Sequence, residues 1–288
     1  MICRKDASPG FDTKPGFASF DSGNKFAMMR GGENRRAIAR GGKGGSTGMR
    51  ITDIRETSIA LNSTLKNSSI DFSEMTTSVV AVITDVMRDG KPVVGYAFNS
   101  TGRYACGAQM RARFIPRIMK AEPASLLDAA GDNFDADTIV AVMMRNEKSG
   151  GHSERSIGIG TIETAVWDAI AKIEQKPLHV VLAARHGGDP RIDKCFVYVG
   201  GGWYAPGKGI RELQDEMKRH LDAGYTMVKM KVGGAPLAED MRRIEAVKSI
   251  LPPHAELAVD ANSKFDLKEA LSYAQAMAPY KLRWFEEP

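Results

Sequence analysis

The pattern of apolar positions divides the chain into a stretch without periodicity and a longer part with regular elements. Residues 1–48 contain ten glycines and no sustained hydrophobic period, so we expect a disordered, Gly-rich basic extension there. From Met49 onward, short apolar runs predict strands over 51–61, 77–83 and 93–98. Asp89-Gly90 predicts a hairpin turn between the second and third of these strands.

Helical periodicity follows the predicted strands. Apolar residues recur on one stripe between Thr161 and Ile173, which predicts a helix with one buried face. The pattern stops at Gly187-Gly188-Asp189-Pro190, residues that favour a turn. We therefore predict an α+β domain over 49–190.

Beyond residue 190, strands and helices alternate strictly. Strands are expected at 196–199, 227–232, 257–260 and 282–285. Amphipathic helices separate them, with apolar stripes at Ile210, Leu213, Met217 and Leu221, and at Met241, Ile244, Val247 and Leu251. Asp266 and Glu269 resemble a capping box that opens a third helix. Repeated β-α units predict a parallel sheet, open or closed into a barrel, so the fold class is α/β.

The distribution of charge along the chain limits the classes of partner that the protein can bind. The formal net charge is +5, but residues 1–48 hold nine basic and four acidic residues, and the remainder holds 31 of each. We therefore expect no nucleic-acid partner and no membrane partner. The chain has three widely spaced cysteines and no long apolar run, which favours a reducing, cytoplasmic setting. Gly41-Gly42-Lys43-Gly44-Gly45 lacks the strand and the Gly-Lys-Ser/Thr sequence of a phosphate-binding loop.

Ionisable residues end three successive predicted strands. Lys229 and Lys231 project to one face of their strand, because side chains at i and i+2 share a face. Mutual repulsion is expected to lower the pKa of at least one of these amines, which would suit a general base. Asp260 and Glu286 end the next two strands. Each residue alone is also explained structurally, as a solvated lysine, a helix cap or a turn, but their order on adjacent strand ends favours a metal-assisted site.

This order resembles the enolase superfamily, in its mandelate racemase/muconate lactonizing enzyme-like branch. The resemblance covers residues 49–288 and implies an α+β N-terminal capping domain followed by a TIM-like (β/α) barrel. It also implies Lys231 and Lys229 as acid/base residues, and Asp260 and Glu286 as ligands of Mg²⁺. Such enzymes abstract the proton α to a substrate carboxylate, and Mg²⁺ stabilises the enediolate that results.

Further segments resemble the D-tartrate dehydratase subgroup of that branch. They are Leu65–Phe72, Gly95–Ser100, Asn146–Arg155 and Pro206–Gly209. The likeness implies that Asn67 and Lys148 bind a small-molecule carboxylate substrate, Lys148 being suited to pair with its charge. His152 is interpreted as a loop hydrogen-bonding group. The implied reaction is β-elimination of water from a 2,3-dihydroxy diacid to give oxaloacetate, with Lys231 as the base.

The chain also departs from the family pattern. The family's third Mg²⁺ carboxylate and its later Asp/His pair have no counterpart in the sequence. Residues 191–288 are therefore expected to be the N-terminal part of a (β/α)7β barrel, about four strands long, in a truncated chain with impaired activity. The alternatives are a racemase or epimerase, another acid-sugar dehydratase, or a non-catalytic fragment. The full-length relative is expected to be a homo-oligomer.

Overall fold

The computed structural model describes residues 48–99, 106–148, 153–192 and 194–288. The predicted extension over 1–48 and the interpretation of His152 thus lie outside the described residues, Gly48 excepted. None of the helices in the described part of the chain is long and apolar enough to cross a membrane. The domain boundary at residue 190 stays a prediction.

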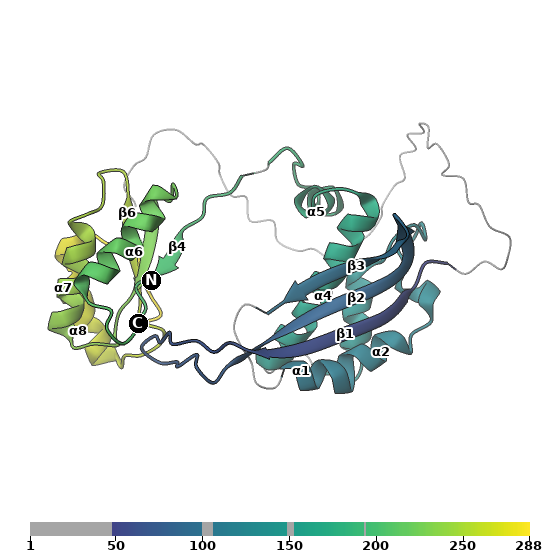
Figure 1. Ribbon diagram of the computed structural model, residues 1–288, viewed down its shortest axis with the longest axis horizontal. Helices are drawn as coiled ribbons and strands as arrows, with labels where there is room; N and C mark the ends of the chain where they lie inside the picture. The colour runs from purple at the N-terminus through teal and green to yellow at the C-terminus, as the bar shows by residue number, and fades with distance from the viewer. Residues whose placement is uncertain (1–47, 100–105, 149–152, 193) are drawn as a thin grey trace, which may run out of the picture. The chain divides into compact units, whose positions relative to one another are not determined.

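The N-terminal part is an antiparallel sheet covered by helices. Its strands are β1 (Ile51–Ala60), β2 (Thr76–Arg88) and β3 (Lys91–Phe98), hydrogen-bonded in the order β1-β2-β3. The helices are α1 (Cys106–Gln109), α2 (Ile115–Met119), α3 (Ala136–Met143), α4 (Ser153–Glu174) and α5 (Leu178–His186). The helix predicted over 161–173 is part of α4. This helix lies across one face of the sheet (Figure 1).

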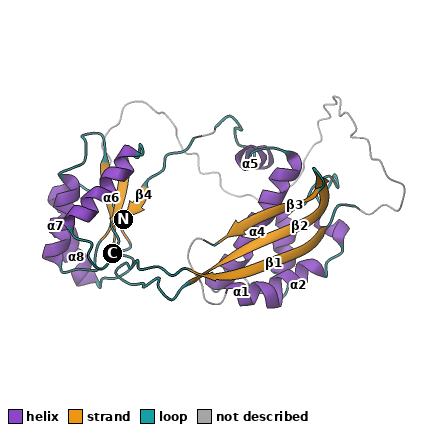
Figure 2. Ribbon diagram, viewed as in Figure 1, coloured by secondary structure: helices purple, strands orange, loops and turns teal. Residues whose placement is uncertain are grey.

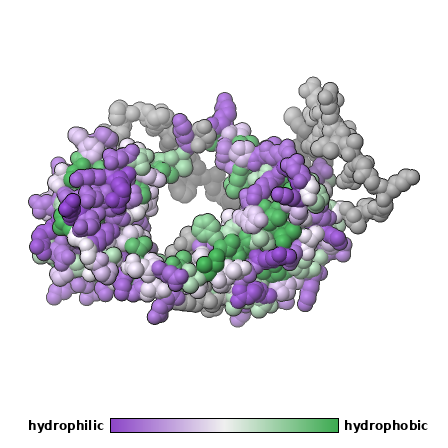
Figure 3. Space-filling model, viewed as in Figure 1, coloured by the Kyte–Doolittle hydropathy of each residue, from purple (hydrophilic) through white to green (hydrophobic). Residues whose placement is uncertain are grey.

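Alternation along β2 builds the core of this part. Val80 and Val82 are fully buried, and they share one core cluster with Ile162, Val166 and Ile170 of α4. The opposite face of the sheet is open, with Tyr96 57% and Phe98 68% exposed. Figure 3 shows hydrophobic side chains gathered on the sheet face that the view presents.

The predicted hairpin turn is confirmed, and its conformation has a simple cause. Asp89 and Gly90 join β2 to β3 with φ values of 49° and 74°. Such left-handed backbone is tolerated by Asp and is unstrained for Gly, and it matches the twist of the flanking strands.

The C-terminal part alternates parallel strands with helices, as Figure 2 shows. Its elements are β4 (Val199–Gly201), α6 (Ile210–Asp222), β5 (Met227–Lys231), α7 (Leu237–Lys248), β6 (Glu256–Asp260), α8 (Leu267–Met277) and β7 (Phe285–Glu286). The sheet order is β4-β5-β6-β7, and all three pairings are parallel. The predicted α/β class and the four parallel strands are confirmed.

Two of the predicted strand positions were wrong. The strand expected at 196–199 is β4 at Val199–Gly201, because backbone pairing with β5 begins at Val199 and extends through the glycines. Phe196 and Val197 lie outside the sheet, 70% and 54% exposed. The strand expected at 282–285 is β7, where only Phe285 and Glu286 pair with β6.

Helix α8 begins as the sequence predicts. The side chain of Asp266 accepts a hydrogen bond from the backbone N–H of Glu269 at 2.8 Å. This N-cap satisfies one of the donors that the first turn of a helix leaves free. It fixes where the chain turns from the end of β6 into α8.

Candidate active site

Parallel register brings the predicted charged residues to one edge of the C-terminal sheet. Lys231 is the partner of Asp260 across β5 and β6, and Asp260 is the partner of Glu286 across β6 and β7. Three successive strands therefore end with their ionisable side chains at the same level. Active-site groups gather at this end of the strands in β/α barrels.

The four side chains form one continuous ionic cluster. Lys231 Nζ donates to Asp260 Oδ2 at 2.8 Å. Lys229 Nζ lies 3.1 Å from the same oxygen and 2.7 Å from Glu286 Oε1. The expectation that both lysines project to one face is thus met, and Asp260 accepts from both.

The pair between Lys231 and Asp260 is buried. The Asp260 side chain is 3% exposed and that of Lys231 is 9% exposed. Burial alone would raise the pKa of Asp260, but the hydrogen bonds from Lys231 and from the backbone of Asn262 outweigh it, so the pKa lies below its ordinary value. The carboxylate is therefore ionised at neutral pH.

The expected lowering of a lysine pKa is not seen at Lys229. Burial would lower the pKa of this amine, but its hydrogen bonds to Glu286 and Asp260 outweigh that effect and raise it. Two carboxylates within hydrogen-bonding distance stabilise the ammonium form more than the neighbouring lysine destabilises it. The spacing of the two lysines in the sequence does not show how closely the carboxylates approach them.

Aromatic rings face both lysines. Lys229 Nζ lies 5.3 Å from the centre of the Tyr198 ring, and Lys231 Nζ lies 4.5 Å from that of Trp203. Trp284 packs edge-on against Tyr198 and donates its Nε1–H to Glu286 Oε2 at 2.9 Å. Rings at these distances favour cations. These rings were not predicted from the sequence, although Tyr198 and Trp203 flank β4.

The loop that carries Asn67 reaches the same end of the sheet. Ser68 Oγ donates to the carbonyl oxygen of Ala261, and Ser69 Oγ donates to that of Asn262 at 2.8 Å. These carbonyls follow Asp260 directly. Asn67 Oδ1 accepts the backbone N–H groups of Ser69 and Ile70, so this oxygen shapes the loop, while the amide nitrogen makes no hydrogen bond to the described residues.

Lys148 lies elsewhere in the described part of the chain. It lines a hollow of about 810 Å³ together with Gln109, Arg113, Asn146, Glu147 and Arg155. Glu147 is the centre of this hollow's ion pairs, 3.4 Å from Arg113 Nε and 3.4 Å from Arg155 Nη1. Among the described residues, no contact joins Lys148 to the ionic cluster of β5, β6 and β7.

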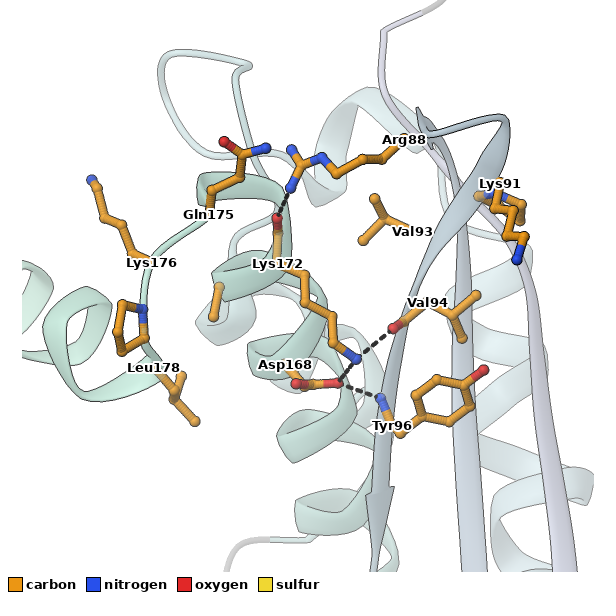
Figure 4. Close-up of a pocket in the computed structure, with 13 residues that line it drawn as sticks. Arg88, Lys91, Val93, Val94, Tyr96, Asp168, Lys172, Gln175, Lys176 and Leu178 are labelled. Atoms are coloured by element: carbon orange, nitrogen blue, oxygen red, sulfur yellow. Dashed lines mark hydrogen bonds and ion pairs between the residues drawn. The ribbon is translucent and has the colours of Figure 1, made fainter.

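A second hollow of about 740 Å³ lies between β3 and the C-terminal half of α4 (Figure 4). Three of its charged side chains, those of Arg88, Asp168 and Lys172, bind backbone groups. Arg88 donates to the carbonyls of Lys172 and Ile173 at the end of α4. Asp168 and Lys172 bind the edge of β3. Because these groups are already engaged, the hollow is not a candidate active site.

The carboxylates of the ionic cluster have the chemistry of a magnesium site. Carboxylate oxygens are hard ligands, and Mg²⁺ is often bound by one or two carboxylates with water completing its shell. Asp260 and Glu286 are such a pair on adjacent strand ends. No group of three or more His, Cys, Asp or Glu residues suited to a metal occurs among the described residues. The residues present thus fit a magnesium ion held by two protein ligands.

Comparison with known proteins agrees with this geometry. Residues 212–288 match the family described as Enolase C-terminal domain-like. The chain is 32% identical to arabinonate dehydratase of Saccharolobus solfataricus over 46% of this chain and 34% of that protein. It is 28% identical to L-talarate/galactarate dehydratase of Salmonella typhimurium over 74% of this chain and 50% of that protein. The chain therefore spans between a third and a half of the length of these relatives.

Solved structures show the same fold. A racemase from Streptomyces coelicolor A3(2), solved with bound magnesium, is 26% identical with a TM-score of 0.62, over 83% of this chain and 62% of that one. The L-talarate/galactarate dehydratase of Salmonella typhimurium LT2 is 23% identical with a TM-score of 0.62, over 88% and 62%. The family match over residues 212–288 and the two dehydratases agree with the resemblance of the chain to the enolase superfamily, and the solved structures show a similar fold.

Proposed function

We propose that the protein is part of a Mg²⁺-dependent dehydratase. This enzyme would remove water from a hydroxy diacid and convert D-tartrate to oxaloacetate. The observation that carries the proposal is the ionic cluster, in which two lysines of β5 lie 2.7–3.1 Å from carboxylates that end β6 and β7. The matched relatives include dehydratases that act on sugar acids. Asn67, whose loop contacts the residues that follow β6, and Lys148 are proposed to bind the substrate.

Lys231 is proposed as the base. In its neutral form it takes the α-proton, the electrons of the C–H bond form a carbon–carbon double bond, and the β-hydroxyl leaves as water with a proton supplied by an acid. The enol that remains tautomerises to oxaloacetate. Lys229, on the same face, is proposed as the second acid/base residue, and its ammonium form would stabilise negative charge on the substrate carboxylate.

Magnesium would be held by Asp260 and Glu286. When bound, the ion would supply Lewis-acid stabilisation of the charge that develops on the substrate carboxylate. A carboxylate that is shared with a cation stabilises a neighbouring ammonium group less, which would lower the pKa of that amine, the direction that a base requires.

The test is an assay with Mg²⁺ in D₂O, in which NMR follows α-proton exchange and oxaloacetate formation from D-tartrate and related hydroxy acids. Turnover is expected to be slow, since only two carboxylate ligands meet among the described residues. Lys231→Met should abolish it, whereas Lys218→Met, at a half-exposed position on α6, should leave it unchanged. Turnover that persists in Lys231→Met would contradict the proposed base.

A racemase is the second candidate, and the Streptomyces coelicolor racemase favours it. The same assay separates the two functions. A racemase would exchange the α-proton and invert the carbon while the hydroxyl stays in place, whereas a dehydratase would release water. Inversion without oxaloacetate would replace the proposed dehydratase by a racemase.

A further inference from the structure

A buried polar network adjoins the end of β5, next to the ionic cluster. Its centre is Asp240 on α7, which is 0% exposed. Asp240 Oδ1 accepts from the Tyr204 hydroxyl at 2.7 Å and from Arg243 Nη1 at 2.8 Å. Asp240 Oδ2 accepts from the Gly233 N–H at 2.7 Å and the Tyr273 hydroxyl at 3.2 Å. A buried carboxylate with four donors is fully satisfied and holds its donors in place.

Arg243 connects this network to two strand ends. Its Nη1 donates to the carbonyl oxygen of Lys231 at 3.0 Å, and its Nη2 donates to that of Gly202 at 2.7 Å. These carbonyls follow β4 and end β5. The planar guanidinium makes these bonds in a fixed fork, which a lysine could not reproduce.

Tyr204 joins the network to the loop that carries Asn67. Its ring lies 4.0 Å from the Arg243 guanidinium, and its hydroxyl is 3.4 Å from the carbonyl oxygen of Lys231. Its backbone N–H and carbonyl pair with those of Lys66 at 3.1 and 3.2 Å. One residue thus contacts both the end of the lysine strand and the residue before Asn67.

We propose that Tyr204 and Arg243, held by Asp240, are positioning residues for Lys231; this rests on the proposed function of Lys231 as the base. Fixing the Lys231 carbonyl fixes the backbone from which its side chain extends to Asp260. A shift of about 1 Å in a reacting group can cost on the order of a hundredfold in rate. Tyr204 and Arg243 contact the carbonyl oxygen of Lys231 and not its amine, so the network acts through the backbone of Lys231.

Tyr273 provides a matched control. Its hydroxyl also donates to Asp240, but its other hydrogen bond goes to the carbonyl oxygen of Ala235 and not to Lys231. Tyr204→Phe and Tyr273→Phe each remove one donor from the same carboxylate. A network that merely stabilises the fold predicts similar effects for both, whereas positioning predicts an effect on Lys231 from Tyr204→Phe alone.

The experiment is NMR of the protein labelled at lysine Cε with ¹³C, where the Lys231 signal is the one lost in Lys231→Arg. We expect this signal to shift by more than its line width in Tyr204→Phe and in Arg243→Lys, and to stay in place in Tyr273→Phe. Circular dichroism confirms the fold of each variant. If Arg243→Lys fails to fold, Tyr204→Phe carries the test, since it removes one oxygen and keeps the ring.

Two outcomes would overturn the positioning role. One is a Lys231 signal that stays at its original place in Tyr204→Phe, and the other is an equal shift in Tyr273→Phe. The proposed function fails separately: a chain that eliminates no water but shows the expected Lys231 shifts would contradict the dehydratase and support the positioning role.

Discussion

The charge balance of the ionic cluster has consequences for pH dependence. Two ammonium groups and two carboxylates neutralise one another. The folded-state pKa of Asp260 lies below its ordinary value of 3.8, so its contribution to stability is complete above pH 3.8 and is lost as pH falls through the folded value. The folded-state pKa of Lys229 lies above 10.5, so its contribution is complete below pH 10.5 and is lost as pH rises further.

We therefore predict that Asp260→Asn lowers the free energy of unfolding of the metal-free protein. The substitution should also make this free energy depend less on pH in the acid range. Removing this buried carboxylate leaves two ammonium groups short of a partner, which should cost about 3–5 kcal/mol. Urea unfolding in EDTA, at neutral pH and at pH values below 3.8, measures both effects. The control is Glu256→Gln, whose pair with Arg283 is half exposed and should contribute less than about 1 kcal/mol. Equal losses in the two variants would contradict the prediction.

At the residue scale, the sequence predicted the ionic cluster but missed the network behind it. Lys229, Lys231, Asp260 and Glu286 could be predicted to meet because strand periodicity and parallel register are simple rules. Asp240 and Arg243 were overlooked, although a signal existed. Asp240 lies four residues before Ile244 and Arg243 four before Val247, so two charged residues occupy the buried stripe of α7. A charge on an apolar stripe needs a buried partner.

At the scale of elements, the contact between α4 and β3 depends on Gly95. A Cβ atom there would lie 1.9 Å from the carbonyl oxygen of Ala165 and 2.6 Å from the amide nitrogen of Ala169. Both are helix backbone atoms, so the helix would have to move away. We predict that Gly95→Ala lowers the free energy of unfolding by about 1–3 kcal/mol or more, as overpacking does.

Gly160, which lies on α4, is the matched control. A Cβ atom at that position would meet no atom within 4 Å. Gly160→Ala should therefore stabilise the protein by up to about 1 kcal/mol through helix propensity. Urea unfolding of the two variants gives changes of opposite sign if helix packing is the cause. A Gly95→Ala variant as stable as the parent would refute the close approach.

The edge of β3 is protected by a pair of side chains from α4. Asp168 Oδ2 accepts the Tyr96 N–H at 2.7 Å, and Lys172 Nζ donates to the Val94 carbonyl at 2.9 Å (Figure 4). These bonds occupy backbone groups that another strand could otherwise pair with, which is a known route to association.

We predict that Asp168→Ala makes the protein associate as its concentration rises, because the Tyr96 N–H is then free at an exposed edge. Sedimentation velocity over a range of concentrations measures this. Lys176→Ala is the control, since Lys176 lines the same hollow but pairs with Glu174 instead of the strand. An Asp168→Ala variant with the same sedimentation as the control would show that the pair does not protect the edge.

At the scale of the whole molecule, local patterns predicted the order of elements better than the contacts between distant ones. The alternation beyond residue 190 was enough to predict the parallel sheet. The position of β4 was missed, because apolar content suggested Phe196–Val199 whereas pairing extends through glycines. The contact of Ser68 with Ala261 joins residues 193 apart in sequence. No periodicity within the loop encodes it, since it depends on how the loop meets the end of β6.

Magnesium should stabilise the folded chain if Asp260 and Glu286 hold it. A ligand that binds the folded state alone adds about 2.7 kcal/mol at a hundredfold excess over its Kd. We therefore expect the thermal midpoint to rise with Mg²⁺ concentration and to fall back on addition of EDTA. Asp260→Asn and Glu286→Gln should lose this response, whereas Glu256→Gln, on the same strand as Asp260 but at its exposed start, should keep it. A thermal midpoint that does not change with Mg²⁺ would contradict magnesium binding. An equal rise in Asp260→Asn would show that the ion binds away from the proposed site.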